Sequence, residues 1–338
     1  MNSNLIDAYA VMLPAFSDLT LSKDVTNFLK QGGMSLLLGE TREEYVSRKM
    51  TSERIRAEKA NDFSFLVSQA KEIAQQPLLV AVDQELGGIQ RLHQLVPALP
   101  SSEEASLLSD DDLEEKAKQV ATTARTLGIN MFLSPIVDIV TGENPWLHNR
   151  TLGQDAAVVG KMANAFTLGI QAGGVAAVAK HFPGHPTSVI DPAIGEAIVK
   201  ATKDELQPTL SVFETLIASD VNAIMIGPAL VPVFDANEPS STSQITIRYL
   251  RETMGFSGLI ISDDLDAPGI HRGRSIAETA IASLIAGADL LLLSSEAGLD
   301  EVANAIIQAA ENGLLKIDRL QDAANRVRKL ATTLASVN

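Results

Sequence analysis

The residues best suited to chemistry stand at the end of one short apolar run. Residues 176–179 read Ala-Ala-Val-Ala, Lys180 and His181 follow directly, and a Pro-Gly pair precedes His185. An apolar run that stops at Pro and Gly predicts a buried strand ending in a loop. Lysine is rarely buried without a partner, so Lys180 indicates an anionic or hydroxyl-rich ligand. The alternative is that Lys180 reaches solvent at the rim while His181 bonds a loop carbonyl.

Other ionisable residues also follow apolar runs. They are Asp83, Glu85 and Arg91 after residues 77–82; Asp138, Glu143, His148 and Arg150 after residues 131–136; and Asp263 and Asp264 after residues 259–262. Solvation alone would scatter charges to both ends of the strands. Their concentration at one end predicts an active site there.

The runs that would position these residues alternate with helical patterns. Eight apolar runs are expected as strands, at residues 8–13, 34–38, 77–82, 131–136, 175–181, 222–227, 259–262 and 289–293. Strands that are apolar throughout predict a parallel sheet covered on both faces. Eight strand-then-helix units fit a single-domain α/β fold, a (β/α)8 TIM-like barrel over residues 1–338, with the active site at the C-terminal strand ends. A doubly wound sheet is the alternative, but neither nucleotide-binding glycine motif is present.

The amino-acid composition and net charge argue against several classes of binding partner. The net charge of −15 and an aromatic content of 4% argue against nucleic acid and against an anionic membrane. The chain has no cysteine, which excludes disulfides and thiolate metal sites. No signal peptide and no membrane span are expected, so the predicted location is cytoplasmic. No long apolar seam asks for a partner, which favours a monomer or a weak homo-oligomer.

Two kinds of site fit these side chains. A metal centre of His181, His185 and Asp263 is one, but the adjacent Lys180 would compete with a cation, so neither metal nor cofactor is expected. Recognition of a polyhydroxylated ligand fits better, because paired carboxyls can flank a glycosidic bond. The single tryptophan, Trp146, could stack on a sugar or pack within its loop.

Four motifs in order resemble glycoside hydrolase family 3, in particular its single-domain bacterial β-N-acetylhexosaminidases of cell-wall recycling. The motifs are Lys180-His181-Phe182-Pro183-Gly184-His185; Asp83-Gln84-Glu85 through Gln90-Arg91; Ser134-Pro135-Ile136-Val137-Asp138 with Asn149-Arg150; and Gly255-Phe256-Ser257-Gly258 through Ser262-Asp263-Asp264-Leu265. The resemblance runs from the second predicted strand to the last helices. It implies the same barrel and a carbohydrate substrate.

The resemblance also implies roles for individual residues. Asp263 would be the nucleophile of a retaining exo-glycosidase, forming a covalent glycosyl intermediate while it releases a terminal sugar such as N-acetyl-β-glucosamine. The hydroxyls of that sugar would be held by Asp83, Arg91, Arg150, Lys180 and His181. Asp264 would be a supporting strand-end residue.

One loop departs from the family pattern. The hexosaminidases carry Asp-x-His there, with the histidine as general acid/base, whereas this chain has Asp191 and then Ala193. A methyl group cannot donate a proton, and the loss of a general acid costs about 10²–10⁴ in rate. Pro186 also replaces a glycine and stiffens the loop.

Three hypotheses follow from this departure. Another residue supplies the proton; the candidates are Asp191, Glu196, Glu143 and His148. Alternatively, the substrate has a good leaving group, and the enzyme then acts on a different glycoside or a different sugar. In the third hypothesis, the protein is a catalytically impaired sugar-binding or sensing protein on the same barrel.

Overall fold

Eight parallel strands form the centre of the molecule. The structure is a computed structural model, and it describes residues 3–336. The strands pair in the order β7-β6-β5-β4-β3-β2-β1-β8, and a parallel bridge between Ile261 and Leu290 joins the two ends of this sheet into a barrel. The strands are β1 (Met12–Phe16), β2 (Ser35–Leu38), β3 (Leu79–Val82), β4 (Met131–Phe132), β5 (Ala176–Phe182), β6 (Ala223–Ile226), β7 (Leu259–Ile261) and β8 (Leu291–Ser294).

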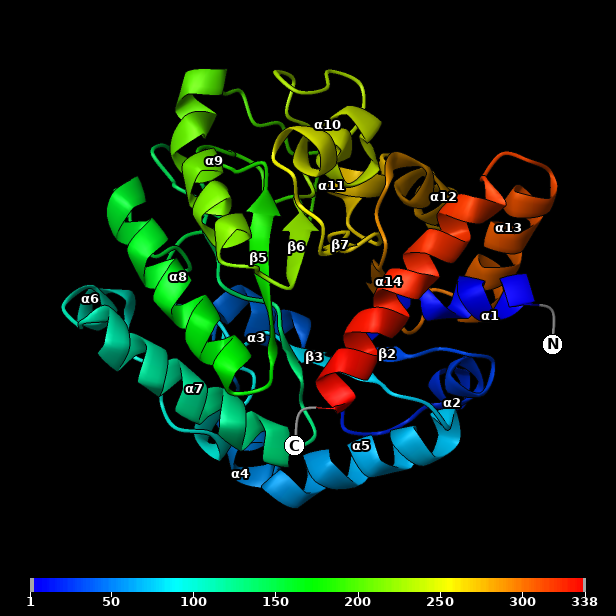
Figure 1. Cartoon of the computed structure of the whole chain (residues 1–338), viewed down its shortest axis with the longest axis horizontal. Coiled ribbons are helices and arrows are strands. Elements are labelled where there is room, and N and C mark those ends of the chain that lie inside the picture. The colour runs from blue at the N-terminus through cyan, green and yellow to red at the C-terminus, as the bar shows by residue number, and fades with distance from the viewer. Residues whose placement is uncertain (1–2, 337–338) are drawn as a thin grey trace.

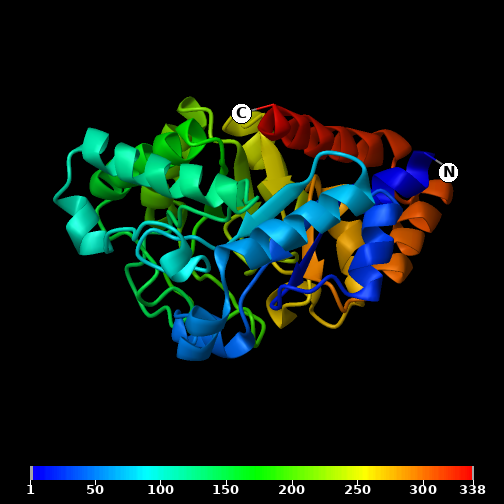
Figure 2. The same ribbon diagram turned by 90° about the horizontal axis from the view of Figure 1, so that it is seen from below.

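Helices surround the barrel and connect successive strands (Figures 1 and 2). They are α1 (Ser3–Ala10), α2 (Lys23–Lys30), α3 (Arg42–Ser47), α4 (Ser52–Ala57), α5 (Ala60–Ala74), α6 (Ser102–Ser106), α7 (Asp110–Thr126), α8 (Ala156–Ala172), α9 (Lys203–Ala218), α10 (Gln244–Arg248), α11 (Pro268–His271), α12 (Ile276–Ala286), α13 (Leu299–Glu311) and α14 (Ile317–Ala335). The predicted (β/α)8 barrel is therefore confirmed. Among the described residues, none of these helices is long and apolar enough to cross a membrane.

Polar residues at the helix starts explain where the helices begin. The hydroxyls of Thr41, Ser101, Thr202 and Ser275 each accept a hydrogen bond from the backbone N–H three residues on. The residue there is a glutamate, and its carboxylate accepts in turn from the backbone N–H of the cap residue. Such a reciprocal cap satisfies two backbone N–H groups that the helix itself leaves free. Because these caps follow the loops that leave the strands, they also fix the loops at the C-terminal end of the barrel.

The beginning of the chain differs from its prediction. Residues 8–13 were expected to form the first strand, but α1 continues to Ala10 and β1 starts only at Met12. Ala8 and Ala10 are buried within that helix, which packs against α13 and α14. A short buried helix and a short buried strand give the same apolar run, and periodicity over so few residues does not separate them.

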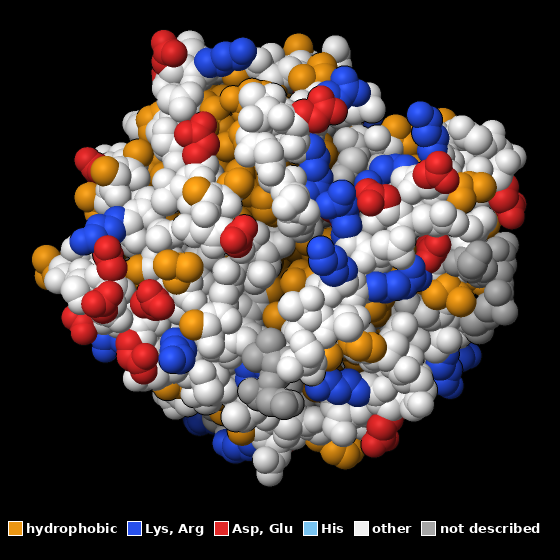
Figure 3. Space-filling view, in the orientation of Figure 1, with side chains coloured by type: hydrophobic (Ala, Val, Ile, Leu, Met, Phe, Trp, Pro, Cys, Tyr) orange, Lys and Arg blue, Asp and Glu red, His pale blue; other side chains and the backbone are white. Residues whose placement is uncertain are grey.

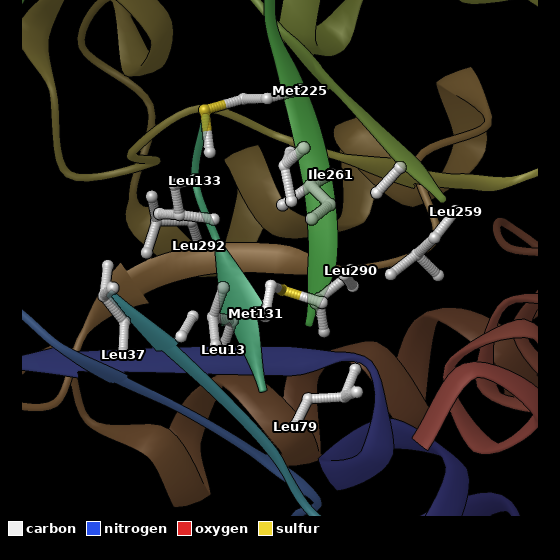
Figure 4. Close-up of a cluster of buried hydrophobic side chains, with 14 of the residues drawn as sticks. Leu13, Leu37, Leu79, Met131, Leu133, Met225, Leu259, Ile261, Leu290 and Leu292 are labelled. Atoms are coloured by element: carbon white, nitrogen blue, oxygen red, sulfur yellow. The ribbon is translucent and has the colours of Figure 1, made fainter. Parts of the chain in front are cut away.

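The barrel interior is filled by layers of apolar side chains (Figure 4). One layer consists of Leu37, Leu133, Met225 and Leu292, which come from β2, the end of β4, β6 and β8. Contribution of four residues by alternate strands is the packing expected of this fold. These four side chains also form the floor of the cavity described below.

The N-terminal end of the barrel is closed by α1 and α14, which pack together. Lys and Arg side chains gather along α14 on the face that Figure 3 shows. Arg319 and Arg326 of α14, together with Arg251 from the segment after α10, surround the buried carboxylate of Asp289. The carboxylate lies just before β8 and accepts a hydrogen bond from Ile260 in β7, so the arginines tie α14 to the seam of the barrel.

Candidate active site

A cavity of about 420 Å³ opens at the C-terminal end of the strands, directly above the apolar floor. Side chains two residues apart on a strand point to the same side. Ala15, Asp83 and Asp263 each stand two residues beyond an inward-facing position of β1, β3 or β7, and all three line this cavity. The alternation that buries the core therefore also delivers two carboxyls to the barrel axis.

Strand β5 contributes two neighbouring residues to the same cavity. In a regular strand Lys180 and His181 would point to opposite faces. The pairing of β5 with β6 shifts register between Ala179 and Phe182, and both side chains line the cavity while remaining buried. The irregularity places a cation and an imidazole side by side.

Lys180 joins two carboxylates. Its Nζ lies 2.6 Å from Asp83 Oδ1 and 2.9 Å from Glu85 Oε1, and Arg150 Nη2 lies 2.6 Å from the same Glu85 atom. Burial alone would lower the pKa of Lys180, but Asp83 and Glu85 raise it above its ordinary value. Burial would likewise raise the pKa of Glu85, but Arg150 and Lys180 hold it well below its usual range. Lys180, Glu85 and Arg150 are therefore charged at neutral pH.

A second network is centred on Asp138. Its Oδ2 accepts from the backbone N–H of His181 at 2.9 Å and lies 2.8 Å from His181 Nδ1. Its Oδ1 makes the equivalent contacts with His185, at 2.8 and 3.0 Å. Burial lowers the pKa of His181 despite this carboxylate, so the ring is neutral, donates through Nδ1 and leaves Nε2 free to accept from a ligand.

The Asp138 cluster is not arranged as a metal centre. Asp138, His181 and His185 bring their ligand atoms within 4.8 Å of one another. However, both Nδ1 atoms and both carboxylate oxygens are already paired with each other. A Cβ at Gly227 would lie 2.1 Å from His185 Cε1, so the second ring is packed tightly against backbone. The cluster orients His181.

Asp263 has one oxygen held and one available. Its backbone N–H donates to Ser241 Oγ at 3.1 Å, and its Oδ1 accepts from the N–H of Asp264 at 2.8 Å. Its Oδ2 is shielded from solvent and has no hydrogen-bond partner. A carboxylate fixed through one oxygen, with the other free in a cavity, has the arrangement that a nucleophile needs.

Asp264 also lines the cavity, near its mouth. Its side chain keeps contact with solvent. Surrounding protein desolvates the carboxyl and Asp266 lies close to it, and together these raise the pKa of Asp264 to about 7. The sequence analysis gave this residue only a supporting role.

Asp191, the candidate acid/base, is not among the residues that line the cavity. Asp191 Oδ1 accepts from the N–H of Ala193 at 2.9 Å, whereas Ala193 itself lines the cavity. The other predicted proton donors also lie outside the lining. Glu196 is paired with Arg272 at 2.8 Å, and Glu143 and His148 are exposed.

Arg91 is also outside the lining. It is fully buried, its guanidinium makes two hydrogen bonds of 2.7 and 2.8 Å to Glu58, and its Nε donates to the carbonyl of Gly39 at 2.6 Å. It therefore holds the end of β2 in place, whereas Asp83, Arg150, Lys180 and His181 line the cavity together.

Three side chains that the sequence analysis left out or left open complete the wall. Trp146 packs against His181 with ring centroids 4.4 Å apart, and its Nε1 donates to Tyr45 Oη at 2.6 Å. Trp146 is buried, so it supports the imidazole and offers little of its face to a ligand. Glu40, two residues after the end of β2, places a further carboxyl in the lining.

The barrel, its apolar-floored cavity and the carboxylates, cations and imidazole at the strand ends define the class as a carbohydrate-active barrel enzyme. A family model described as the glycosyl hydrolase family 3 N terminal domain matches residues 15–330. The chain therefore belongs to glycosyl hydrolase family 3, whose members hydrolyse O-glycosyl bonds. This confirms the family expected from the motifs.

Several known proteins are similar over much of their length. A β-hexosaminidase of Methylobacillus flagellatus is 32% identical over 241 residues, covering 68% of each chain. A β-hexosaminidase of Stenotrophomonas maltophilia is 32% identical over 250 residues, covering 71% of this chain and 74% of that one. A family 3 β-N-acetylglucosaminidase from Paenibacillus superposes on this chain with a TM-score of 0.86 at 25% sequence identity. The match covers 98% of this chain and 62% of that protein.

Proposed function

We propose that the protein is a retaining exo-glycosidase of the β-N-acetylhexosaminidase type that uses Asp263 as its nucleophile. The observation that carries this proposal is the free Oδ2 of Asp263 in a cavity lined by sugar-binding side chains. Attack of this oxygen on the anomeric carbon breaks the glycosidic C–O bond, releases the aglycone and forms a glycosyl ester; water then displaces the Asp263 carboxylate and releases the sugar with retention of configuration. The names of the related proteins support N-acetyl-β-glucosamine as the sugar.

The remaining groups hold the non-reducing terminal sugar. Lys180 and Arg150 donate to hydroxyl oxygens, Asp83 accepts from hydroxyls, and the free Nε2 of His181 accepts from one more. Because Lys180 and Arg150 are already paired with carboxylates, these groups keep their positions before a ligand arrives. Arg91 supports the site indirectly, because its hydrogen bond fixes the backbone of Gly39.

The first chemical step depends on the leaving group. Ala193 lines the cavity where the family pattern has its proton donor, and a methyl group cannot protonate the departing oxygen. Aryl glycosides, which leave without protonation, are therefore expected to react faster than disaccharides. The same residue favours a second candidate, a sugar-binding protein of low turnover on the same barrel.

A panel of p-nitrophenyl β-glycosides tests this proposal, with Asp263→Asn beside the wild type and Asp111→Asn as control. Asp111 is exposed in the first turn of α7, away from the cavity. We expect release of nitrophenol from the N-acetyl-β-glucosaminide, a loss of roughly 10³-fold or more in Asp263→Asn, and little change in the control. Absence of turnover on every glycoside, together with a melting temperature raised by N-acetylglucosamine, would support the binding protein instead.

A further inference from the structure

Glu40 is a cavity-lining carboxyl to which the proposed mechanism gives no task. It stands two residues after the end of β2 and lines the cavity together with Asp83. Its Oε2 atom is shielded from solvent and has no hydrogen-bond partner. A buried polar atom without a hydrogen-bond partner destabilises the folded protein by about 1–3 kcal/mol. Because such atoms are rare in native proteins, this one needs a structural or functional explanation.

The backbone around Glu40 is held on both sides. The N–H of Gly39 donates to the carbonyl of Phe16 at 2.8 Å, and the carbonyl of Gly39 accepts from Arg91 Nε at 2.6 Å. On the other side Thr41 caps α3, where its hydroxyl accepts from the N–H of Glu44 at 3.3 Å. The unpaired carboxyl therefore stands on a fixed piece of chain, which is the support a binding residue needs.

The charged groups that act on the Glu40 carboxyl already form ion pairs with one another. Asp83, Glu85, Lys180 and Arg150 all act on its carboxyl, and their two positive and two negative charges are paired among themselves. Burial first, and then the negative charges of Asp83 and Glu85, raise the pKa of Glu40 to about 8. At neutral pH the side chain is thus an uncharged acid with one O–H to donate and lone pairs to accept.

We propose that Glu40 is a further sugar-binding residue of this site, and that it shares with Asp83 and Lys180 an uncharged, hydroxyl-bearing edge of the terminal sugar. This inference rests on the proposed function, because it takes Asp83 and Lys180 to hold that sugar. A hydroxyl can donate to Glu40 and accept from it at once, which satisfies the unpaired oxygen. An anionic substituent fits less well, because Lys180 and Arg150 are already engaged with Asp83 and Glu85.

The test pairs variants of the residue with analogues of the sugar. Dissociation constants are measured by calorimetry at pH 7 for N-acetylglucosamine and its 3-, 4- and 6-deoxy analogues, with the full chain carrying Glu40→Ala, Glu40→Gln or no change. Glu43→Gln is the matched control, since Glu43 is exposed on the adjacent helix and does not line the cavity. Melting temperatures of all variants check that each is folded.

We expect one deoxy analogue to bind the wild type about 10-fold more weakly than N-acetylglucosamine, as the loss of one good hydrogen bond implies. Glu40→Ala should weaken N-acetylglucosamine by a similar factor but leave the affinity for that analogue unchanged, because the contact is already missing. Glu40→Gln should restore most of the affinity, since its amide also donates and accepts. Glu43→Gln should match the wild type.

Each contrary result has a distinct meaning. If the wild type binds N-acetylglucosamine but Glu40→Ala binds it within about twofold of the wild type, the role of Glu40 is overturned while the proposed function stands. Equal weakening of the sugar and all three analogues would also overturn it, since that pattern indicates an indirect effect on folding. If Glu40→Gln keeps its affinity and its turnover of aryl glycosides but loses turnover of disaccharides, Glu40 is a proton donor rather than a binding residue. A wild type that binds none of these sugars overturns both proposals.

Discussion

Lys180 Nζ lies 2.6 Å from Asp83 Oδ1, a contact between β5 and β3 that joins residues 97 positions apart. Both side chains line the cavity, and Lys180 is also bound to Glu85. The pair therefore has two consequences. It links two strands by charged groups above the apolar floor, and it keeps a cation of the proposed sugar site in a fixed position.

Replacing Lys180 with methionine should destabilise the protein by about 3 kcal/mol, because it leaves Asp83 and Glu85 buried without their shared cation. Lys180 helps to hold the pKa of Glu85 low, so its loss raises that pKa, and protonation of Glu85 relieves the repulsion as the pH falls. The deficit should therefore be larger at pH 8 than at pH 5 in urea unfolding. Lys161→Met is the control, because Lys161 is 61% exposed and its pair with Asp110 is a surface contact. A deficit independent of pH would contradict this account.

Glu40→Gln should make the folded state more stable relative to the wild type as the pH rises. The pKa of Glu40 is about 8 in the folded protein and 4.5 at its ordinary value, so between these the folded wild type retains a proton that the unfolded chain has released. Wild-type stability from this group is thus complete below about pH 4.5 and is lost as the pH rises through 8. The difference in unfolding free energy between variant and wild type should grow by more than about 1 kcal/mol from pH 5 to pH 8.5. Glu43→Gln should show no such trend.

Asp138→Asn should lower the free energy of unfolding by about 3 kcal/mol and weaken sugar binding. An asparagine cannot accept the four N–H groups that both oxygens of Asp138 now receive from His181 and His185. The His181 ring then loses the contact that fixes its orientation. Thermal unfolding and calorimetry measure the two effects, with the exposed Asp318→Asn as comparison. Retention of full sugar affinity would show that His181 does not contact the ligand.

Ala193→His should increase the rate on a β-linked disaccharide by about 10²-fold, with a much smaller gain on p-nitrophenyl glycosides. Ala193 lines the cavity, and Asp191 stands two residues away to orient an introduced imidazole. Ala193→Phe provides similar bulk without an ionisable group and should bring no gain. Equal gains from both substitutions would mean that shape rather than proton transfer limits the reaction.

Four residues of the candidate site could be predicted from the sequence, because ionisable side chains stand where the apolar runs of the strands end. Asp83, Lys180, His181 and Asp263 were predicted because each follows an apolar run, and they line one cavity. Arg150 lies in a loop, yet it reaches the same cavity through Glu85. Parallel strands carry their C-terminal ends to one face, so this part of the site depends only on where the strands stop.

Glu40 escaped prediction although it obeys the same rule. It stands two residues after the end of β2, but Thr41, Arg42, Glu43 and Glu44 come next, and this polar run is typical of a solvent-exposed helix start. Arg91 shows the opposite case, since its buried ion pair with Glu58 joins segments that no local pattern relates. Whether a charged residue such as Glu40 or Arg91 lines the cavity depends on ion pairs between segments that are distant in the sequence. A single sequence does not reveal these pairs.

The layer of Leu37, Leu133, Met225 and Leu292 belongs to the barrel core and to the floor of the cavity at once. The depth of the pocket is therefore set by the volume of four apolar side chains, one from each alternate strand, and the ion pairs of the site lie among other residues. A larger or smaller residue at Met225 would raise or lower a bound sugar against Asp263 without altering a single ion pair. The distance of a bound sugar from the nucleophile and the polar contacts to that sugar can thus change independently in this scaffold. The change in stability that accompanies a new floor residue comes from packing rather than from electrostatics.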